Sequence, residues 1–432
     1  MFSSLTSVEK HGRLVFQRAW SEWYFLANPR SFVLTHLPLE GDQILPEKQG
    51  LLYPITSAKE WANMALVSPM AIEYGVKTIS HPEAVVKTTS GEVSIEYECD
   101  FPLSQFVKVW QRERRENNVR ERTSDSVSNQ VRLVLGSTTR NTVLARFARP
   151  GEFRVKVFGE VRLGHPDLAR TQCLLDYVIK NSGRSPSLPV GAPCSWGVRR
   201  DFRNAGFKVL EPREPITDAV KGRARVRVRL PTSGYFPNKF NLTFSDGEGR
   251  NEAMNDCVIA SRDSNTATYI VQCPLKGEYL LQLSVKYDKP SRSGEGFQTG
   301  ASFLVRCNTP AQQVHYIDTS GCLPGPNNNF YEQSFVTSAT STFLRAHDGV
   351  VRLFVKHLAS PRVRAQLVKA DRDHQQISHL VSVRALTTEI SSISVRLGER
   401  RGVYLLMLYS SVLNNVNQTY TGCFVVSNER LT

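Results

Sequence analysis

The chain has 432 residues, of which 41% are hydrophobic and 22% are charged, a composition that is typical of folded globular proteins and excludes wholesale disorder. No apolar run approaches the roughly 20 residues needed to cross a bilayer. The first ten residues lack a basic segment followed by an apolar one, so we expect no secretory signal and a cytoplasmic location. Fifty-four basic and 40 acidic residues leave a formal charge of +14.

The N-terminal segment, residues 1–73, differs in composition from the rest of the chain. Aromatic residues are dense between residues 20 and 26, and residues 56–65 have the apolar spacing and the leading Thr and Ser of a short capped helix. The segment is too small and too helical to form a β-sandwich, so we predict that residues 1–73 are a separate, helical segment.

One strand pattern occurs three times in the remaining chain. It consists of a glycine, one further residue, an aromatic residue and a largely apolar run. The three copies begin at Gly151, Gly277 and Gly402, which are 126 and 125 positions apart. A period this long indicates whole domains, because solenoid repeats have periods of about 20 to 50 residues.

The neighbours of this strand recur as well. An earlier strand follows Gly91, Gly222 and Gly349, and in it apolar and polar residues alternate, which places one face on a core and the other in water. A third strand follows about 20 positions after each copy. Several short strands with turn signals between them indicate an antiparallel β-sandwich.

We therefore predict a mainly β protein with three tandem immunoglobulin-like antiparallel β-sandwiches. The predicted boundaries are 74–181, 206–308 and 327–432 for the sandwiches, with a connector rich in Pro and Gly at 182–205 and a linker at 309–326.

Eight cysteines are spread thinly along the chain, and none forms a Cys-x-x-Cys pair, so we expect neither a metal site nor a redox site. Cys173, Cys307 and Cys423 fall in the third strand of each repeat, where a free thiol behaves as a small buried hydrophobe. Cys194, in the connector, is the best candidate for a hidden nucleophile, but nothing near it in sequence clearly lowers its pKa. We expect no catalytic residue, no cofactor and no small-molecule substrate.

The densest basic run lies at residues 108–122, where three glutamates interrupt six basic residues. It is either a solvated loop or strand edge, or a contact for acidic protein surfaces or anionic lipid. Nucleic acid is disfavoured, because no stacking aromatics follow the arginines. Since Trp and Arg are enriched at interaction hot spots, the candidate partner-binding residues are Trp110, Arg112, Arg114 and Arg115.

The aromatic segment at residues 23–38 resembles the segment that follows the transglutaminase-like core in the kyphoscoliosis peptidase and hillarin family. The resemblance rests on Tyr24-Phe25-Leu26, Pro29, Phe32, His36 and Pro38. Further matches are the stretch from Gly75 to Ser80-His81-Pro82, and Cys194-Ser195-Trp196-Gly197, which is similar to a Gly-Trp-Gly motif of the family.

The resemblance implies that this chain corresponds to the non-catalytic C-terminal part of that family, with residues 1–73 as a helical remnant of the end of its transglutaminase-like domain. In relatives the catalytic Cys, His and Asp precede the Tyr-Phe-Leu segment, whereas here the residues before it hold one histidine, His11, and no cysteine or aspartate. No catalytic residue can be carried over, so the expected function is that of a non-enzymatic pseudoenzyme scaffold that binds protein partners, with the link to the cytoskeleton that the resemblance implies. One alternative is a truncated gene model whose catalytic part lies upstream of Met1. Another is a basic module for anionic lipid or nucleic acid.

Overall fold

The computed structural model describes most of the chain, in two compact units, Met1–Ser187 and Leu188–Thr432. The division falls inside the expected connector. The described residues are 3–10, 13–20, 39–40, 43–44, 58–68, 71–72, 74–100, 104–115, 118–122, 131–135, 140–162, 169–186, 188–193, 195–199, 202, 206–230, 237–263, 265–286, 297–319, 321, 323–358, 362–371, 373, 375–411 and 418–428.

The N-terminal segment is helical only in part. Strands β1 (Ser3–Lys10) and β2 (Arg13–Trp20) form an antiparallel pair, and β3 (Leu39–Glu40) pairs with β4 (Gln43–Ile44). The helix expected at 56–65 is present as α2 (Ala58–Asn63), while its capping residues lie outside the described part of the chain. Residues 3–20 thus form a strand pair, which their β-branched and aromatic residues favour.

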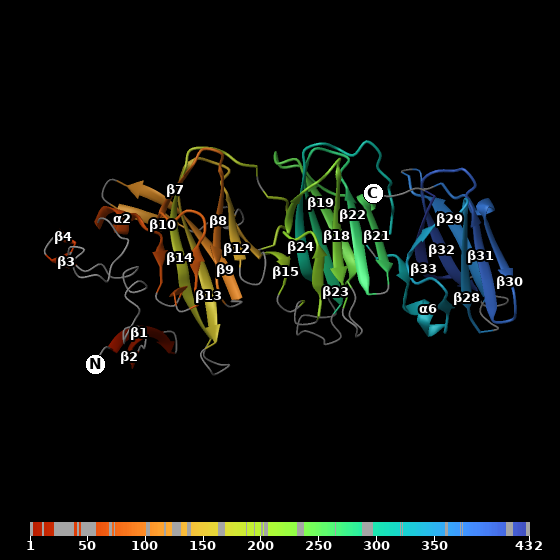
Figure 1. The fold of residues 1–432 in the computed structure, drawn as a ribbon, viewed down its shortest axis with the longest axis horizontal. Coiled ribbons are helices and arrows are strands. Elements are labelled where there is room, and N and C mark those ends of the chain that lie inside the picture. The colour runs from red at the N-terminus through yellow and green to blue at the C-terminus, as the bar shows by residue number, and fades with distance from the viewer. Residues whose placement is uncertain are drawn as a thin grey trace. The chain divides into compact units, whose positions relative to one another are not determined.

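The first sandwich consists of two antiparallel sheets (Figure 1). The β8 sheet has the order β6 (Lys77–Thr78), β8 (Glu92–Glu98), β12 (Arg140–Arg146), β11 (Val131–Leu135). The β13 sheet has the order β10 (Asn118–Arg122), β9 (Ser104–Arg115), β13 (Gly151–Arg162), β14 (Ala169–Asn181). Beyond β14 lie β5 (Leu66–Val67), which is antiparallel to it, and β7 (Val85–Thr88), which is parallel.

The second sandwich repeats this plan within the second unit. The β18 sheet has the order β16 (Lys208–Glu211), β18 (Arg223–Arg229), β22 (Thr266–Gln272), β21 (Val258–Asp263), and the short helix η3 (Asn255–Cys257) precedes β21. The β23 sheet has the order β20 (Asn251–Ala253), β19 (Pro237–Ser245), β23 (Gly277–Lys286), β24 (Phe297–Cys307), β15 (Ser195–Val198), with β17 (Ile216–Asp218) parallel to β24.

The third sandwich has the same arrangement of strands as the first two. The β28 sheet has the order β26 (Val336–Thr337), β28 (Val350–Lys356), β31 (Ile390–Arg396), β30 (Val381–Ala385), and η4 (Ser378–Leu380) precedes β30. The β32 sheet has the order β29 (Arg362–Lys369), β32 (Val403–Ser411), β33 (Gln418–Ser427), β25 (Gly325–Pro326), with β27 (Phe343–Arg345) parallel to β33. The helix α6 (Asn328–Glu332) lies between β25 and β26, and Asn327 caps it by accepting a hydrogen bond from the Phe330 amide.

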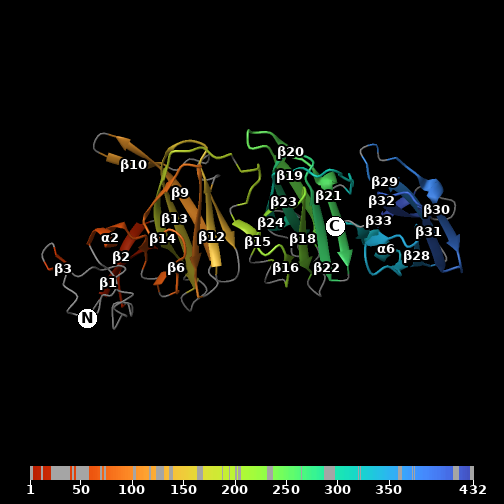
Figure 2. The same ribbon diagram turned by 45° about the horizontal axis from the view of Figure 1, so that its top comes forward.

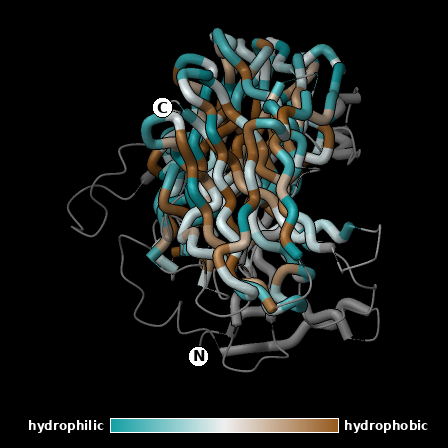
Figure 3. The backbone as a smooth tube through the Cα atoms, turned by 90° about the vertical axis from the view of Figure 1, so that its right-hand side faces the viewer, coloured by the Kyte–Doolittle hydropathy of each residue, from teal (hydrophilic) through white to brown (hydrophobic). Residues whose placement is uncertain are grey.

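The prediction of three tandem sandwiches is confirmed, and its physical basis is the alternation in the earlier strand of each repeat. In β8, β18 and β28 every second side chain is buried in a core, and the residues between them are more exposed. Each sandwich has its own cluster of buried apolar residues between its sheets, because alternate residues of a strand face opposite sides. Figure 3 shows hydrophobic stretches along the strands and hydrophilic colour at many of the connecting turns. Among the described residues, no helix is long and apolar enough to cross a membrane.

A turn that leads into each sandwich also occurs three times, although only two copies can be read from the sequence. Gly75 and Gly206 have φ of +63° and +91°, and the residue after each donates its amide to the carbonyl five positions earlier. In the third sandwich Ser334, with φ +57°, holds the place of the glycine, and the Phe335 amide donates to the Phe330 carbonyl in the same way. A left-handed residue other than glycine hides the third copy from a search for glycine.

Candidate functional site

The basic run at residues 108–122 folds into the hairpin β9–β10, at the edge of the β13 sheet. Trp110 and Arg112 lie in the part of β9 that pairs with β13, opposite Arg154 and Glu152. Arg114 pairs through its backbone with Val119 in β10, as Arg115 does with Asn118, but the side chains of Arg114 and Arg115 lie outside the described part of the structure. The four candidate residues therefore all lie on β9. Two of them, Trp110 and Arg112, lie where β9 pairs with β13, so the sandwich fixes the positions of their side chains.

The two faces of β9 have opposite character. Val109 is buried in the core of the first sandwich, whereas Lys108 is exposed and Trp110 and Arg112 are half-buried on the outer face. The same alternation continues on β13 and β14, so the outer face of the β13 sheet presents a set of side chains that are charged or aromatic, apart from one valine. They are Lys108, Trp110, Arg112, Glu152, Arg154, Lys156, Phe158, Asp176, Val178 and Lys180.

The centre of this outer face is a group of two aromatic rings and two ammonium groups. The Lys156 Nζ lies 5.8 Å from the centroid of the Trp110 ring, and the Lys108 Nζ lies 5.7 Å from that of Phe158. The two rings are 6.5 Å apart and inclined by 60°. Cations within about 6 Å of an aromatic face are attracted by its quadrupole, which holds Trp110 in a fixed position on the sheet.

Ion pairs surround this group. Arg112 Nη1 lies 2.6 Å from Glu152 Oε1, directly across the strand pair. Arg154 donates hydrogen bonds to both carboxylate oxygens of Asp176, with Nε 2.9 Å from Oδ1 and Nη2 2.6 Å from Oδ2. Lys156 Nζ is 3.3 Å from the same carboxylate, which is only 7% exposed.

The outer face of the β13 sheet therefore carries a net positive charge. Its five Lys and Arg side chains face two carboxylates, and both carboxylates are already engaged with arginines. Lys156, Phe158 and Asp176 were not among the residues predicted from the sequence. The alternation of β13 could have indicated their outward direction, but only the strand pairing places them beside Trp110.

The equivalent face of the third sandwich is an internal docking surface. Counting from Gly151 and Gly402, the positions of Glu152, Arg154 and Lys156 correspond to Val403, Leu405 and Met407. In the third sandwich these apolar residues are covered by the second. Val403, Leu405, Cys423, Val425 and Ala370 form one buried cluster with Ile259 and Ile317, and Ile270, Phe343, Val368 and Met407 pack against it. The outer face of the β32 sheet thus docks onto the outer face of β21 and β22.

The segment between the second and third sandwiches takes part in this junction. The side chain of Gln272 donates to the His315 carbonyl at 2.6 Å and accepts from its amide at 2.9 Å. The Tyr316 amide donates to Ala370 of the third sandwich, and the Ile317 amide donates to Asp256 of the second. The side chain of Ile317 is fully buried in the junction. The linker expected at 309–326 therefore includes residues that bond both sandwiches.

The docking surface is not repeated at the far side of the third sandwich. Ile259 and Ile270 are cross-strand partners, and the register gives Ser382 and Ser394 as the same pair in β30 and β31. Two serines in place of two isoleucines make this outer face polar.

The thiols and imidazoles give no second site in the described part of the chain. Cys307 and Cys423 are buried as expected, while Cys173 is half-buried and its burial raises the pKa of the thiol to about 11. Cys194 and His36 lie outside the described residues. Within the described ranges there is no group of three or more His, Cys, Asp or Glu side chains that could hold a metal ion.

Comparison with known proteins gives one family. The family model described as "KY-like, immunoglobulin-like domain" matches residues 58–189 and 195–318, which is more than half of the chain. A search of curated proteins found no match.

Two solved structures are similar over 82% of this chain. An I-band fragment from titin is 8% identical, with 97% of its own length covered and a TM-score of 0.14. A complex of Dpr2 with DIP-Theta is 9% identical, with 99% covered and a TM-score of 0.15.

Proposed function

Because this chain belongs to the family with KY-like, immunoglobulin-like domains, we propose that it is a non-enzymatic scaffold that binds a protein partner through the outer face of its β13 sheet. Immunoglobulin-like sandwiches present flat sheet faces and end loops rather than deep clefts, and such surfaces suit protein partners. Trp110 would be the anchor of the contact, with Arg112, Arg154 and Lys156 around it.

One observation carries this proposal. The β13 sheet of the first sandwich is equivalent to the β32 sheet of the third. The outer face of the β32 sheet already docks onto the second sandwich within this chain. The same face in the first sandwich has charges and a tryptophan where the third has Val403, Leu405 and Met407. The outer face of the β13 sheet therefore cannot dock onto an apolar surface such as that of Ile259 and Ile270. Such docking would bury its net positive charge, which costs several kcal/mol per ion. A partner with acidic groups around an apolar centre would neutralise those charges.

The place of action is part of the proposal. The family resemblance of residues 23–38 favours a cytoplasmic protein associated with the cytoskeleton. Co-sedimentation of the purified chain with actin filaments and with microtubules tests this association. A chain that stays in the supernatant with both polymers would contradict it.

The binding face is tested with two variants of matched chemistry. Trp110→Ala removes the aromatic anchor, and Phe354→Ala removes an exposed aromatic that lies between Arg352 and Lys356 on β28 of the third sandwich. Each chain is used to capture proteins from a lysate, and captured proteins are then purified and titrated by calorimetry. We expect at least one partner whose dissociation constant rises about 30-fold or more with Trp110→Ala, as for a hot-spot tryptophan, and stays unchanged with Phe354→Ala.

Other outcomes would redirect the proposal. Partners that respond equally to both variants would remove the first sandwich from the contact. Tighter binding to anionic vesicles or nucleic acid than to any protein, with a steep loss as salt rises, would favour the basic-module alternative. A transcript with Cys, His and Asp codons upstream of Met1 would favour the transglutaminase-like enzyme.

A further inference from the structure

The outer face of the second sandwich carries a row of arginines. In β18, Arg223, Arg225, Arg227 and Arg229 alternate with the buried residues Ala224, Val226 and Val228. The last three arginines of the row are exposed. Alternate residues of a strand point to the same side and are about 6.8 Å apart, so the row is a line of guanidinium groups with a regular period. Figure 2 shows β18 between β16 and β22.

The neighbouring strands do not neutralise Arg225, Arg227 and Arg229. On β22 the cross-strand partners of Arg225, Arg227 and Arg229 are Ile270, Thr268 and Thr266, none of which is charged. On the other side, β16 places Lys208 opposite Arg229 and Glu211 opposite Arg227. Among the described residues, neither Glu211 nor any other acid forms an ion pair with these three arginines.

In the first sandwich, the charged residues of the equivalent strand, β8, are neutralised by a neighbouring strand. Glu92 and Glu96 occupy in β8 the positions that Arg223 and Arg227 occupy in β18, counting from Gly91 and Gly222. Each of the two glutamates meets an arginine of β12. Arg146 Nε lies 2.7 Å from Glu92 Oε2, and Arg140 Nη2 lies 2.5 Å from Glu96 Oε2.

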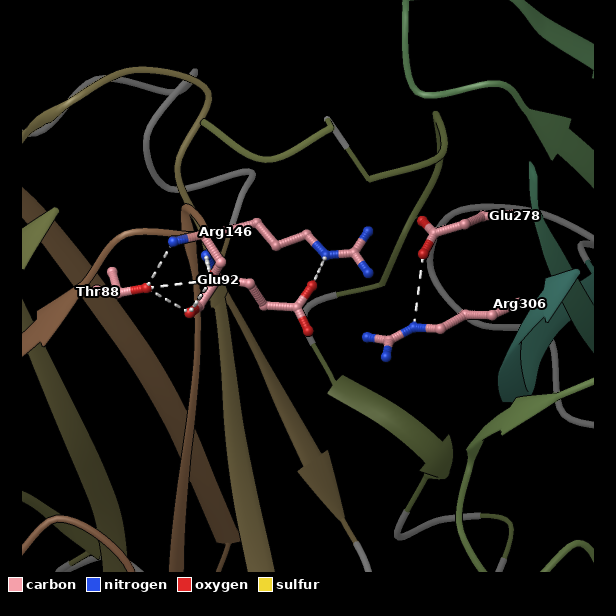
Figure 4. Close-up of polar contacts among 6 residues, drawn as sticks. Thr88, Glu92, Arg146, Glu278 and Arg306 are labelled. Atoms are coloured by element: carbon pink, nitrogen blue, oxygen red, sulfur yellow. Dashed lines mark hydrogen bonds and ion pairs between the residues drawn. The ribbon is translucent and has the colours of Figure 1, made fainter. Parts of the chain in front are cut away.

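Cross-strand pairing of opposite charges is thus used in the first sandwich and also between Glu278 and Arg306 in the second, where Nε and Oε1 are 3.6 Å apart (Figure 4). In Figure 4 the Glu92 backbone carbonyl also accepts from the Thr88 hydroxyl, at 2.9 Å. The row in β18 departs from this pattern. Like charges on one strand face repel each other, so a polyanion that covers the row would relieve that repulsion.

A hollow adjoins one end of the row. It has a volume of about 860 Å³, and Arg223 and Arg225 are in its wall together with Lys221, Glu211 and Asp218. Its apolar contacts come from Pro212, Ala224, Ile270, Pro310 and Val220, and the side chain of Val220 is 74% exposed. The hollow therefore offers room for an apolar side chain next to a line of positive charge.

We propose that β18 binds an extended acidic segment of a partner protein, with carboxylates on alternate residues facing Arg225, Arg227 and Arg229 and an apolar side chain in the hollow. An extended peptide repeats its side chains on one face with the same period of about 6.8 Å as the row, so each carboxylate meets one guanidinium.

The chemistry of the face disfavours two other polyanions. Single-stranded nucleic acid needs aromatic platforms for its bases, and the outward residues beside the row are Thr266, Thr268 and Ile270. An anionic membrane would bring its charge onto Glu211 and Asp218 at the same time, because they lie beside the basic residues in the hollow. A peptide can place its carboxylates along the row alone. This surface is separate from the Trp110 face, and the proposal does not depend on it.

The test uses the full chain and fluorescein-labelled peptides. The probe is a peptide in which glutamate alternates with threonine and which ends in leucine; the control peptide has the same composition with its glutamates in one block. The protein variant is Arg225→Gln, Arg227→Gln and Arg229→Gln together. The matched variant is Arg352→Gln, Lys356→Gln and Arg396→Gln, which removes three exposed basic residues from the β28 sheet of the third sandwich.

We expect the alternating peptide to bind the native chain, with fluorescence anisotropy that falls as salt rises. The triple variant in β18 should bind about 10- to 30-fold more weakly, as for the loss of three exposed charge-assisted contacts, and the β28 variant should bind within twofold of the native chain. Circular dichroism melts check both variants, and Arg227→Gln alone, expected to weaken binding about threefold, serves if the triple variant does not fold.

Three results would overturn the proposal. The first is equal binding by the native chain and the β18 variant. The second is equal binding of the alternating and the block peptide, which would remove the spacing argument. The third is tighter binding of oligo(dT) or of phosphatidylserine vesicles than of the alternating peptide.

Discussion

Replacement of Ile317 by alanine is expected to separate the second and third sandwiches energetically. Its side chain is 0% exposed and lies in the cluster formed by Ile259 of the second sandwich and Leu405 of the third. An isoleucine that is fully buried and becomes alanine costs about 2–5 kcal/mol, part of it from the transfer of the lost carbons and part from the cavity. We expect a loss of about 3 kcal/mol in the free energy of unfolding, within that range.

The position of this loss distinguishes a junction from an ordinary core. In the native chain, β22 and β32 should unfold at the same urea concentration, because the junction couples them. In Ile317→Ala the two strands should unfold at different concentrations. The matched control is Ile393→Ala, which removes the same atoms from the core of the third sandwich alone and leaves the junction intact.

The assay is urea unfolding with pulsed hydrogen exchange, read by mass spectrometry for peptides from β22 and β32 separately. The reasoning is refuted if Ile317→Ala lowers the free energy of unfolding by less than about 1 kcal/mol, the size expected for a side chain without packing partners. It is equally refuted if the native chain already shows separate transitions for the two strands.

Three further changes have expected outcomes. Ile259→Ser places in the second sandwich the residue type that the third sandwich has at the equivalent position, Ser382. The junction should weaken by about 3 kcal/mol while both sandwiches stay folded, so small-angle scattering should show a larger radius of gyration. An unchanged radius of gyration would contradict this. Ser334→Gly should raise the free energy of unfolding by about 0.5–1 kcal/mol in a thermal melt, because the left-handed backbone costs serine more than glycine. Burial raises the pKa of Cys173 from 9.0 to about 11, so its alkylation at pH 8 should be about 100-fold slower than that of a free thiol and should rise about tenfold per pH unit up to pH 11. The unfolded thiol ionises at lower pH, so this group's contribution to stability is present below pH 9 and is lost as pH rises through 11; a rate at pH 8 equal to that of free cysteine would contradict the shift.

The sequence by itself determined the number and type of the sandwiches. The alternation in β8, β18 and β28 decides which side chains face a core, because the strand period of two is a local property of the backbone. The recurrence of Gly151, Gly277 and Gly402 indicated one strand in each sandwich, because a turn glycine followed by a strand is also a local feature of the sequence. The direction of Trp110 and Arg112 away from the core follows from this alternation too.

Only the tertiary structure decided what lies opposite those outward residues. Asp176 is 22 positions from Arg154 in sequence, and strand pairing brings the two together. Ile317 lies in a segment predicted as a linker, and sandwich docking buries it. The neutralised charges of Glu92 and Glu96, in contrast to Arg225, Arg227 and Arg229 in β18, also depend on which strand is the neighbour. Pairing between distant strands and packing between sheets are non-local, so the pattern within one strand cannot specify them.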